Sequence, residues 1–218
     1  MLFPSTFAGR DMKQIPILLV LGVALSLCNL TGKLKKAGSA GGAVSPGETG
    51  NANVEHAEPT AAQIAALAGG QTVKWDKQGM SWTVPPKWTE ATNETKMLVW
   101  RSPGSWDAAS LIANVSPMDE NFPTETSLKA FYDSAKTRAK NGEVDELKWL
   151  EIDGVKGVEF REANPEKQDD QRRLQWLAYR KYVGQVQMVN LMLATRGRDF
   201  ARDQDAMYGV LYSTKVVH

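Results

Sequence analysis

The sequence predicts an α+β domain: a central antiparallel sheet of about six to eight strands with helices packed on it. Period-two hydrophobic patterns dominate the chain from residue 72 onward, and short turn signals join them in pairs. Two further segments carry a helical stripe instead. All seven tryptophans lie between Trp75 and Trp176, which places the hydrophobic core in this part of the chain.

Four hairpins account for the predicted strands. The clearest one turns at Asp153-Gly154, a dipeptide that two-residue hairpin turns favour because both positions need a positive φ. The last pair turns at Gly184 and is apolar on both faces, as is typical of central strands covered on both sides. The predicted strands are Val73–Asp76, Met80–Val84, Lys96–Arg101, Ala109–Ser116, Leu147–Ile152, Val155–Glu162, Arg172–Tyr182 and Gln185–Ala194.

Two helices are predicted to cover this sheet. The first spans about Thr126 to Lys140 and stops at Asn141-Gly142. The second begins after Asp199, which we expect to be its N-cap, and runs toward Ser213. The apolar stripes are Leu128, Phe131, Tyr132, Ala135 and Ala139 on the first helix, and Phe200, Met207, Tyr208 and Leu211 on the second.

The beginning of the chain has the pattern of an export signal. An apolar run, Ile15–Leu27, follows basic residues and is shorter than the roughly 20 residues that a spanning helix needs. The only cysteine, Cys28, ends this run. Leu25-Ser26 fits the lipobox of bacterial lipoproteins, whereas Leu27 departs from it. A start at Met12 gives the more typical signal.

We therefore predict that residues 1–28 are a signal peptide and that Cys28 carries a lipid. The lipid would anchor the chain to a bacterial membrane on its extracytoplasmic side. An uncleaved signal anchor, and a cleaved signal with an incidental cysteine, stay open as alternatives.

Residues 29–71 are predicted to form a flexible tether. They are rich in Ala, Gly, Ser and Thr, contain no Phe, Trp or Tyr, and bury too little apolar surface to offset the entropy of ordering. A capping-box pattern from Thr60 to Gln63 begins a short Ala-rich helix, which we expect to be transient unless it docks. The folded domain is then predicted over residues 72–218.

Composition excludes several classes of function. The 26 Lys and Arg residues against 25 Asp and Glu give a formal net charge of +1, so no whole-chain field favours nucleic acid. One cysteine and two histidines, His56 and His218, argue against a thiolate or histidine metal centre. No phosphate-loop or other cofactor motif is present. We expect no metal, no cofactor and no nucleic-acid partner.

Carboxylate doublets are the candidates for acid–base chemistry. They are Asp119-Glu120, Asp145-Glu146 and Asp169-Asp170. Adjacent residues on a strand point to opposite faces, so such doublets rarely form a catalytic pair. We expect solvated side chains here, and a carboxylate-dependent hydrolase stays the less favoured alternative.

The tryptophans divide into six expected core residues and one candidate contact residue. Trp75, Trp82, Trp88, Trp100, Trp149 and Trp176 each lie in or beside a predicted strand. Trp106 instead lies in a turn between two strands, next to Gly104, Ser105 and Asp107, which would project its indole away from the sheet. Trp106 is therefore the candidate contact residue for a partner.

Residues 79–88, GMSWTVPPKW, resemble the opening signature of the PsbP-like superfamily, and the order of the predicted hairpins and helices is also similar. The resemblance implies an α/β/α sandwich and points to the bacterial lipoprotein branch of the DcrB and LpqN type. Members of the superfamily mostly serve as binding or assembly modules and share no catalytic residue set. We expect a non-catalytic, lipid-anchored envelope module whose partner is an unknown protein or small ligand, with a scaffolding protein as the alternative.

Overall fold

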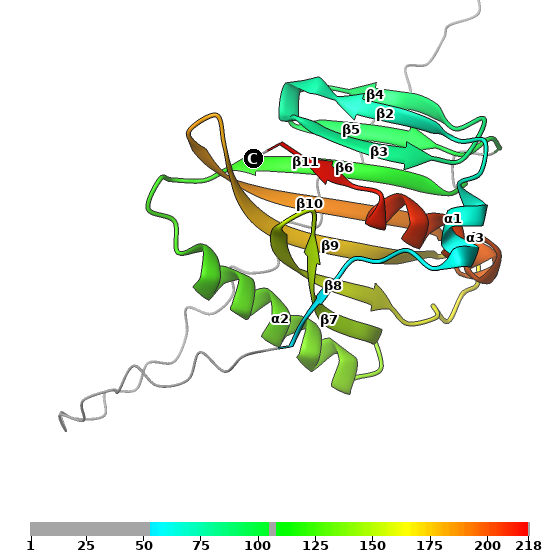
Figure 1. Cartoon of the computed structure of the whole chain (residues 1–218). Helices are drawn as coiled ribbons and strands as arrows, with labels where there is room; N and C mark the ends of the chain where they lie inside the picture. Colours follow the sequence, from blue (N-terminus) through cyan, green and yellow to red (C-terminus); the bar gives the residue numbers. More distant parts are fainter. Residues whose placement is uncertain (1–52, 105–107, 218) are drawn as a thin grey trace, which may run out of the picture. The chain divides into compact units, whose positions relative to one another are not determined.

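The computed structural model describes residues 53–104 and 108–217. A large sheet of eight strands has the order β1-β7-β8-β9-β10-β6-β5-β4 (Figure 1). Its pairs are antiparallel except that β1 runs parallel to β7. The strands are β1 (Val54–His56), β4 (Thr89–Asn93), β5 (Met97–Arg101), β6 (Ser110–Pro117), β7 (Val144–Ile152), β8 (Val155–Glu162), β9 (Gln171–Tyr182) and β10 (Gln185–Arg196).

A second, smaller sheet has three strands in the order β11-β3-β2. It contains the hairpin of β2 (Gln71–Trp75) and β3 (Met80–Val84), which a 3-10 turn, η1 (Asp76–Gln78), connects, and the short strand β11 (Lys215–Val216). This hairpin was expected in the main sheet, and the structure corrects that placement. The α+β fold class itself is confirmed.

The two long hairpins end in the tight turns that their sequences predict. Asp153 and Gly154 have φ of 49° and 81°, and Val183 and Gly184 have φ of 49° and 76°. Two successive left-handed residues match the twist of the flanking strands. These turns fix the register of β7 on β8 and of β9 on β10.

Helices cover both faces of the large sheet, as expected. The helix α2 (Thr124–Lys140) lies along one face and contacts β7, β8 and β9 (Figure 1). The helix α3 (Gly197–Tyr212) contacts β9 and β10 on the other face, and it also contacts β3 of the small sheet. Within the described residues, no helix is long and apolar enough to span a membrane.

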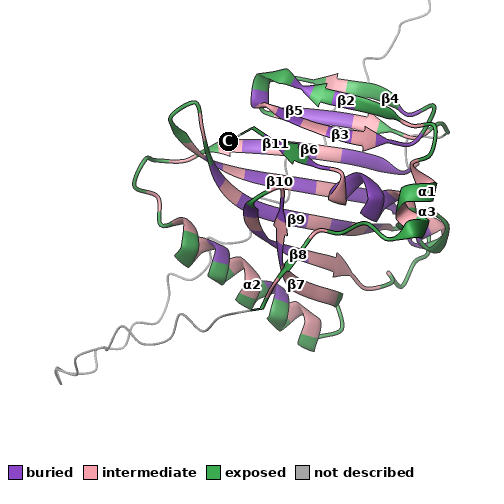
Figure 2. Ribbon diagram, viewed as in Figure 1, coloured by how far each residue is buried: buried purple, intermediate pink, exposed green. Residues whose placement is uncertain are grey.

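Two hydrophobic clusters correspond to these two faces (Figure 2). The larger one joins the small sheet, α3 and the large sheet, and it contains fully buried side chains such as Trp82, Trp176 and Phe200. The smaller one lies between α2 and the sheet around Leu128 and Leu177. All six tryptophans expected in the core belong to or pack against these clusters, with Trp100 and Trp149 half-buried.

Part of the predicted tether belongs to the folded domain. Residues 54–66 form β1 and the helix α1 (Ala61–Ala66), and α1 contacts α3. The capping box is present: the Gln63 amide donates to the Thr60 hydroxyl at 3.3 Å, and the Thr60 amide donates to Gln63 Oε1 at 2.9 Å. Gly209 allows this close docking, because a Cβ there would lie 2.8 Å from the Gln63 carbonyl oxygen. The helix is therefore docked, and the domain begins before residue 72.

The start of α3 also differs from the expectation. Arg196, not Asp199, occupies the N-cap position, and no side chain caps the helix. Asp199 lies in the first turn, where its carboxylate meets Arg196 Nε at 2.8 Å and Arg202 Nη1 at 3.0 Å. A carboxylate in the first turn still interacts favourably with the helix dipole, which explains why the sequence signal lay close to the true start.

Candidate functional site

A cluster of charged and phenolic side chains lies between α3 and the β7–β8 hairpin. We call it the charged cluster; its members are Glu146 and Lys148 of β7, Glu159 and Arg161 of β8, and Tyr208 and Tyr212 of α3. The hairpin register sets Lys148 directly opposite Glu159 and Glu146 opposite Arg161. Opposite charges therefore face one another across the two strands, which is the favourable cross-strand arrangement.

Lys148 is the centre of the cluster. Its Nζ lies 3.1 Å from Glu159 Oε1, 3.1 Å from Glu146 Oε1 and 3.7 Å from Glu55 Oε2. It also donates a hydrogen bond of 3.1 Å to the Tyr212 hydroxyl. Glu159 is completely buried, so this ammonium is its counter-charge.

Arg161 closes the other half of the cluster. Its Nη1 lies 3.0 Å from Glu146 Oε2 and donates to the Tyr208 hydroxyl at 3.1 Å. The Tyr208 hydroxyl in turn donates to Glu146 Oε2 at 2.6 Å. Arg161 Nε also meets Asp145 Oδ1 at 2.6 Å. Each cation of the cluster thus contacts at least two carboxylates.

The cluster shifts the pKa values of its members in different directions. Burial raises the pKa of Glu159 to about 7, although Lys148 opposes this shift. Burial alone would lower the pKa of Lys148, but the charge of Glu159 and the Tyr212 hydroxyl raise it overall. Burial would raise the pKa of Glu146, yet the hydrogen bonds from Tyr208 and Lys148 lower it overall. Glu159 therefore exchanges a proton near neutral pH beside a charged lysine.

A cavity of about 440 Å³ opens onto this cluster. Its wall includes Glu146, Lys148 and Arg161, together with Thr60 and Gln63 at the start of α1. Glu159 is fully buried and is not part of the wall of this cavity, so its carboxylate does not reach a molecule there. A buried carboxylate with a pKa near 7 is a candidate general base, but only when a substrate can reach it. The arrangement of the charged cluster therefore fits a structural role, in which it joins α3 to the sheet, better than it fits acid–base catalysis.

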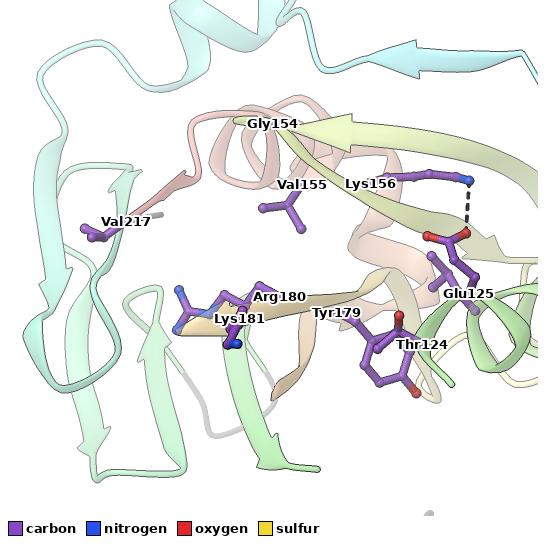
Figure 3. Close-up of a pocket in the computed structure, with 10 residues that line it drawn as sticks. Thr124, Glu125, Gly154, Val155, Lys156, Tyr179, Arg180, Lys181 and Val217 are labelled. Carbon is purple, nitrogen blue, oxygen red and sulfur yellow. Dashed lines mark hydrogen bonds and ion pairs between the residues drawn. The ribbon is translucent and has the colours of Figure 1, made fainter. Parts of the chain in front are cut away.

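A second cavity, of about 390 Å³, opens where β8 and β9 separate; we call it the split pocket (Figure 3). The pairing of β8 with β9 ends at Gly157 opposite Ala178. Beyond this pair, β8 stays paired with β7 as far as Val155, and β9 stays paired with β10 as far as Tyr182. The two strands diverge, and the space between them is the pocket.

Three elements supply most of the wall of the split pocket, and Gly154 and Val217 complete it. Thr124 and Glu125 belong to the first turn of α2, Val155 and Lys156 to β8, and residues 179–181 to β9. Adjacent residues of a strand point to opposite faces, yet Arg180 and Lys181 both line the cavity. The pocket therefore extends through the gap between the strands.

Arg180 has an unusual setting for a buried cation. It is 7% exposed, and its Nε donates to Gln187 Oε1 at 3.2 Å. Its Nη2 donates to the Gln78 carbonyl oxygen at 2.5 Å, and its guanidinium lies 4.5 Å from the centre of the Tyr182 ring. Its Nη1 is buried without a hydrogen-bond partner in the described structure. Burial lowers the pKa of this guanidinium, and neutral groups surround it.

The two lysines of the pocket are less enclosed. Lys156 Nζ lies 3.4 Å from Glu125 Oε2, a carboxylate whose side chain is 78% exposed, and 4.9 Å from the centre of the Trp149 ring. Lys181 is exposed. The wall of the split pocket therefore carries three cations against one exposed carboxylate.

The two site residues that the sequence predicted, Cys28 and Trp106, lie outside the described residues and stay predictions. The Asp169-Asp170 doublet lies in the loop between β8 and β9, where Asp169 pairs with Arg198 at the start of α3. Within the described residues, no group of three or more potential metal-ligating His, Cys, Asp or Glu side chains comes together.

The Asp145-Glu146 doublet corrects one expectation. Both carboxylates contact the same arginine, Arg161, instead of pointing to opposite faces. The register between β7 and β8 shifts between Val144 and Glu146, so Asp145 lies in a bulge and turns toward the same side as its neighbour.

Sequence reasoning missed the charged cluster and the split pocket. A usable signal for the cluster lay in the Asp153-Gly154 turn, because residues equidistant from a two-residue turn face one another. Counting outward from this turn pairs Lys148 with Glu159 and Glu146 with Arg161. Nothing local in the sequence marks the split pocket, since it depends on where β8 leaves β9.

Fold and sites together define an α+β sandwich domain with one internally paired ionic cluster and one basic pocket. No family model matches the chain, and no curated protein matches it by sequence. Similar solved structures include cyanobacterial PsbP (CyanoP) from Synechocystis sp. PCC 6803, at 15% identity and a TM-score of 0.43 over 67% of this chain and 92% of that one.

The similar structures also include LpqN, involved in cell envelope biogenesis of Mycobacterium tuberculosis, at 12% identity and a TM-score of 0.44 over 68% of this chain and 86% of that one. The Ran-binding protein Mog1p of Saccharomyces cerevisiae matches at 10% identity and a TM-score of 0.38 over 68% of this chain and 95% of that one. All three of these likenesses have TM-scores below 0.5. Likenesses at this level do not extend to function.

Proposed function

We propose that the protein is a non-catalytic binding or assembly module, held on the extracytoplasmic side of a bacterial membrane by a lipid on Cys28. The observation that carries the anchor is the position of the only cysteine, directly after the apolar run Ile15–Leu27. The Ala- and Gly-rich sequence between Cys28 and β1 would hold the domain away from the membrane surface. The chain would then act in the cell envelope, where LpqN is also involved.

The contrast between the two cavities supports a binding role over a catalytic one. The charged cluster pairs its cations with its own carboxylates and keeps Glu159 away from the cavity. The split pocket instead presents positive charge that its own wall does not balance. An unbalanced, concave surface is a feature of a binding site.

The anchor is tested by metabolic labelling with an alkyne fatty acid, followed by membrane fractionation. The wild-type chain is expected to carry the label and to sediment with membranes. Cys28→Ser is expected to lose the label and to leave the membrane fraction or stay unprocessed, while Ser39→Ala in the tether behaves like the wild type. A Cys28→Ser chain that stays full-length and membrane-bound, with an unlabelled wild type, would establish a signal anchor instead.

Trp106 is the proposed contact residue for a macromolecular partner. Trp106→Ala is expected to weaken capture of a partner in a crosslinking pull-down and to leave the melting temperature nearly unchanged. Trp82→Ala is the matched control, because Trp82 is 1% exposed and its loss should lower the melting temperature strongly. A large drop in melting temperature for Trp106→Ala would show that this indole is part of the core.

A further inference from the structure

We propose that the split pocket binds an oxyanion, the phosphate or carboxylate group of a small ligand, and that Arg180 anchors it. The inference rests on the proposed binding function and names the chemistry that a ligand of this domain would carry. It depends on three features: a buried cation without a counter-charge, further cations in the same wall, and the first turn of a helix facing the same space.

The burial of Arg180 is the strongest of these features. Removing a guanidinium from water costs several kcal/mol unless an anion compensates for the lost hydration. The hydrogen-bond acceptors of Arg180 are a backbone carbonyl and the side chains of Gln78 and Gln187, all of them neutral. Within the described residues, no carboxylate forms an ion pair with it. A guanidinium stays protonated at neutral pH, so the charge remains unmatched.

One nitrogen of Arg180, Nη1, is buried and is not used by the hydrogen bonds of the protein. Gln78, Gln187 and the ring of Tyr182 hold the guanidinium through Nε, Nη2 and its flat face. Nη1 is left without a partner in the described structure. Figure 3 shows the guanidinium extending toward Val217, which is 58% exposed. Arg180 and Val217 both line the split pocket.

Arg172 shows what the fold does when it satisfies a buried arginine itself. It lies eight residues earlier on the same strand, on the same face, and is 8% exposed. Its Nη2 pairs with Asp145, its Nη1 donates to Asn164 Oδ1 at 2.7 Å, and its Nε donates to the Glu162 carbonyl at 2.7 Å. A carboxylate completes the site of Arg172, and the equivalent position at Arg180 is what an oxyanion ligand would fill.

The other charged groups in the wall of the split pocket also favour an anion. Lys156 and Lys181 add two cations, and Glu125 is too exposed to neutralise three of them. The helix α2 begins at the pocket with no side chain capping its first turn. The positive end of its dipole therefore also favours an anion.

The test is an NMR titration of the ¹⁵N-labelled full chain with inorganic phosphate and, separately, with succinate, each against sodium chloride at equal ionic strength. We expect saturable shifts in the amides of Gly154, Val155 and Lys181, and none at Gly142 beyond the far end of α2. Saturation by phosphate alone or by succinate alone identifies the group that the pocket prefers. Shifts that chloride reproduces, or no saturation with either anion, would overturn the proposal.

Variants separate the role of Arg180 from general surface charge. Arg180→Gln is expected to weaken the affinity for the saturating anion by about tenfold or more, because a charge-assisted pair of hydrogen bonds is lost. Lys181→Gln is expected to weaken it by about threefold. Lys136→Gln, an exposed lysine on α2 outside the pocket, should leave it unchanged. An Arg180→Gln affinity equal to that of the wild type would overturn the anchoring role.

Two further comparisons separate anion binding in the split pocket from the folding of the Arg180 variant and from the lipid anchor. If Arg180→Gln fails to fold, the double variant Lys156→Gln with Lys181→Gln changes only the outer charge of the pocket, and unchanged binding there would overturn the proposal. A wild-type chain that binds phosphate but carries no lipid label would overturn only the proposed anchor at Cys28. A chain that carries the label but binds neither anion would overturn only the proposed anion site.

Discussion

The strand β9 carries a buried arginine near each end, and only one of the two faces a carboxylate. Arg172 pairs with Asp145, which the bulge at the start of β7 brings within reach. Arg180 is held by two glutamines and a tyrosine ring. The pairing of β8 with β9 ends two residues short of each arginine, so the difference lies in the surrounding side chains: Asp145 reaches Arg172, whereas within the described residues no carboxylate pairs with Arg180.

The lysines of the β7–β8 hairpin repeat this contrast. Lys148 lies in the closed part of the hairpin, within 3.1 Å of two carboxylates. Lys156 lies near the turn, where it meets the exposed carboxylate of Glu125 at 3.4 Å. Charge is therefore balanced internally where α3 covers the sheet and left unbalanced where the sheet divides. The first region serves stability, and the second is available to a ligand.

The largest expected effect is a difference in the free energy of unfolding between variants of the two arginines. Arg172→Met should lower the free energy of unfolding by about 3 kcal/mol, because it leaves Asn164 and a backbone carbonyl without their partner and leaves Asp145 with Arg161 alone. Arg180→Met should lower it by only about 1 kcal/mol, since removing a charge without an ionic partner offsets the unpaired acceptors left behind. Urea unfolding at neutral pH measures both, and equal losses would contradict the account.

The next effect concerns the pH dependence of stability. In the folded protein, burial raises the pKa of Glu159 to about 7 from its ordinary value of 4.5. The folded state then binds more protons than the unfolded state between these two values, so the stability that Glu159 contributes falls as the pH rises through this window. The loss should approach about 3 kcal/mol by pH 8.

Other groups of the charged cluster titrate outside this window. The pKa of Glu146 is lowered, and those of Lys148, Tyr208 and Tyr212 are raised further above neutrality. Glu159→Gln should therefore flatten the profile of unfolding free energy between pH 5 and pH 8. Urea titrations across this range test it, and a variant that keeps the wild-type slope would show that Glu159 is not responsible.

The smallest effect is expected at the outer lysine. Lys156→Gln removes one weak ion pair with an exposed carboxylate, so the free energy of unfolding should change by no more than about 0.5 kcal/mol. Thermal or chemical unfolding without added phosphate measures this change. A loss as large as that of Arg172→Met would mean that Lys156 supports the fold and does not merely line the pocket.

Local signals predicted most of the fold. The turns at Asp153-Gly154 and Val183-Gly184, the alternation along β9 and β10, and the stripe of α2 all have the form that the sequence indicated. Three strands, β1, β4 and β11, were missed. The strands β1 and β11 have too few residues to show a pattern, and β1 depends on pairing with β7; β4 is a polar edge strand with mostly exposed residues, so it shows no apolar alternation.

The candidate sites were less predictable, for a physical reason. In the sequence, Glu159 and Arg180 are two charged residues among many. Their burial depends on how the strands pair and on which elements pack over them. Glu159 meets Lys148 because of the hairpin register, which the turn could have predicted. Within the described residues no carboxylate pairs with Arg180, and no local sequence signal marks this, because it depends on which side chains the fold places around the guanidinium.

The measurement that tests the central claim most directly is urea unfolding of the full chain in rising concentrations of inorganic phosphate at constant ionic strength, with wild type and Arg180→Gln in parallel. A ligand that binds only the folded state adds about 1.4 kcal/mol for each tenfold rise above its dissociation constant. We predict this rise for the wild type and a nearly flat line for Arg180→Gln. Equal slopes for the two proteins would contradict the claim that the charge of Arg180 is completed by an external anion.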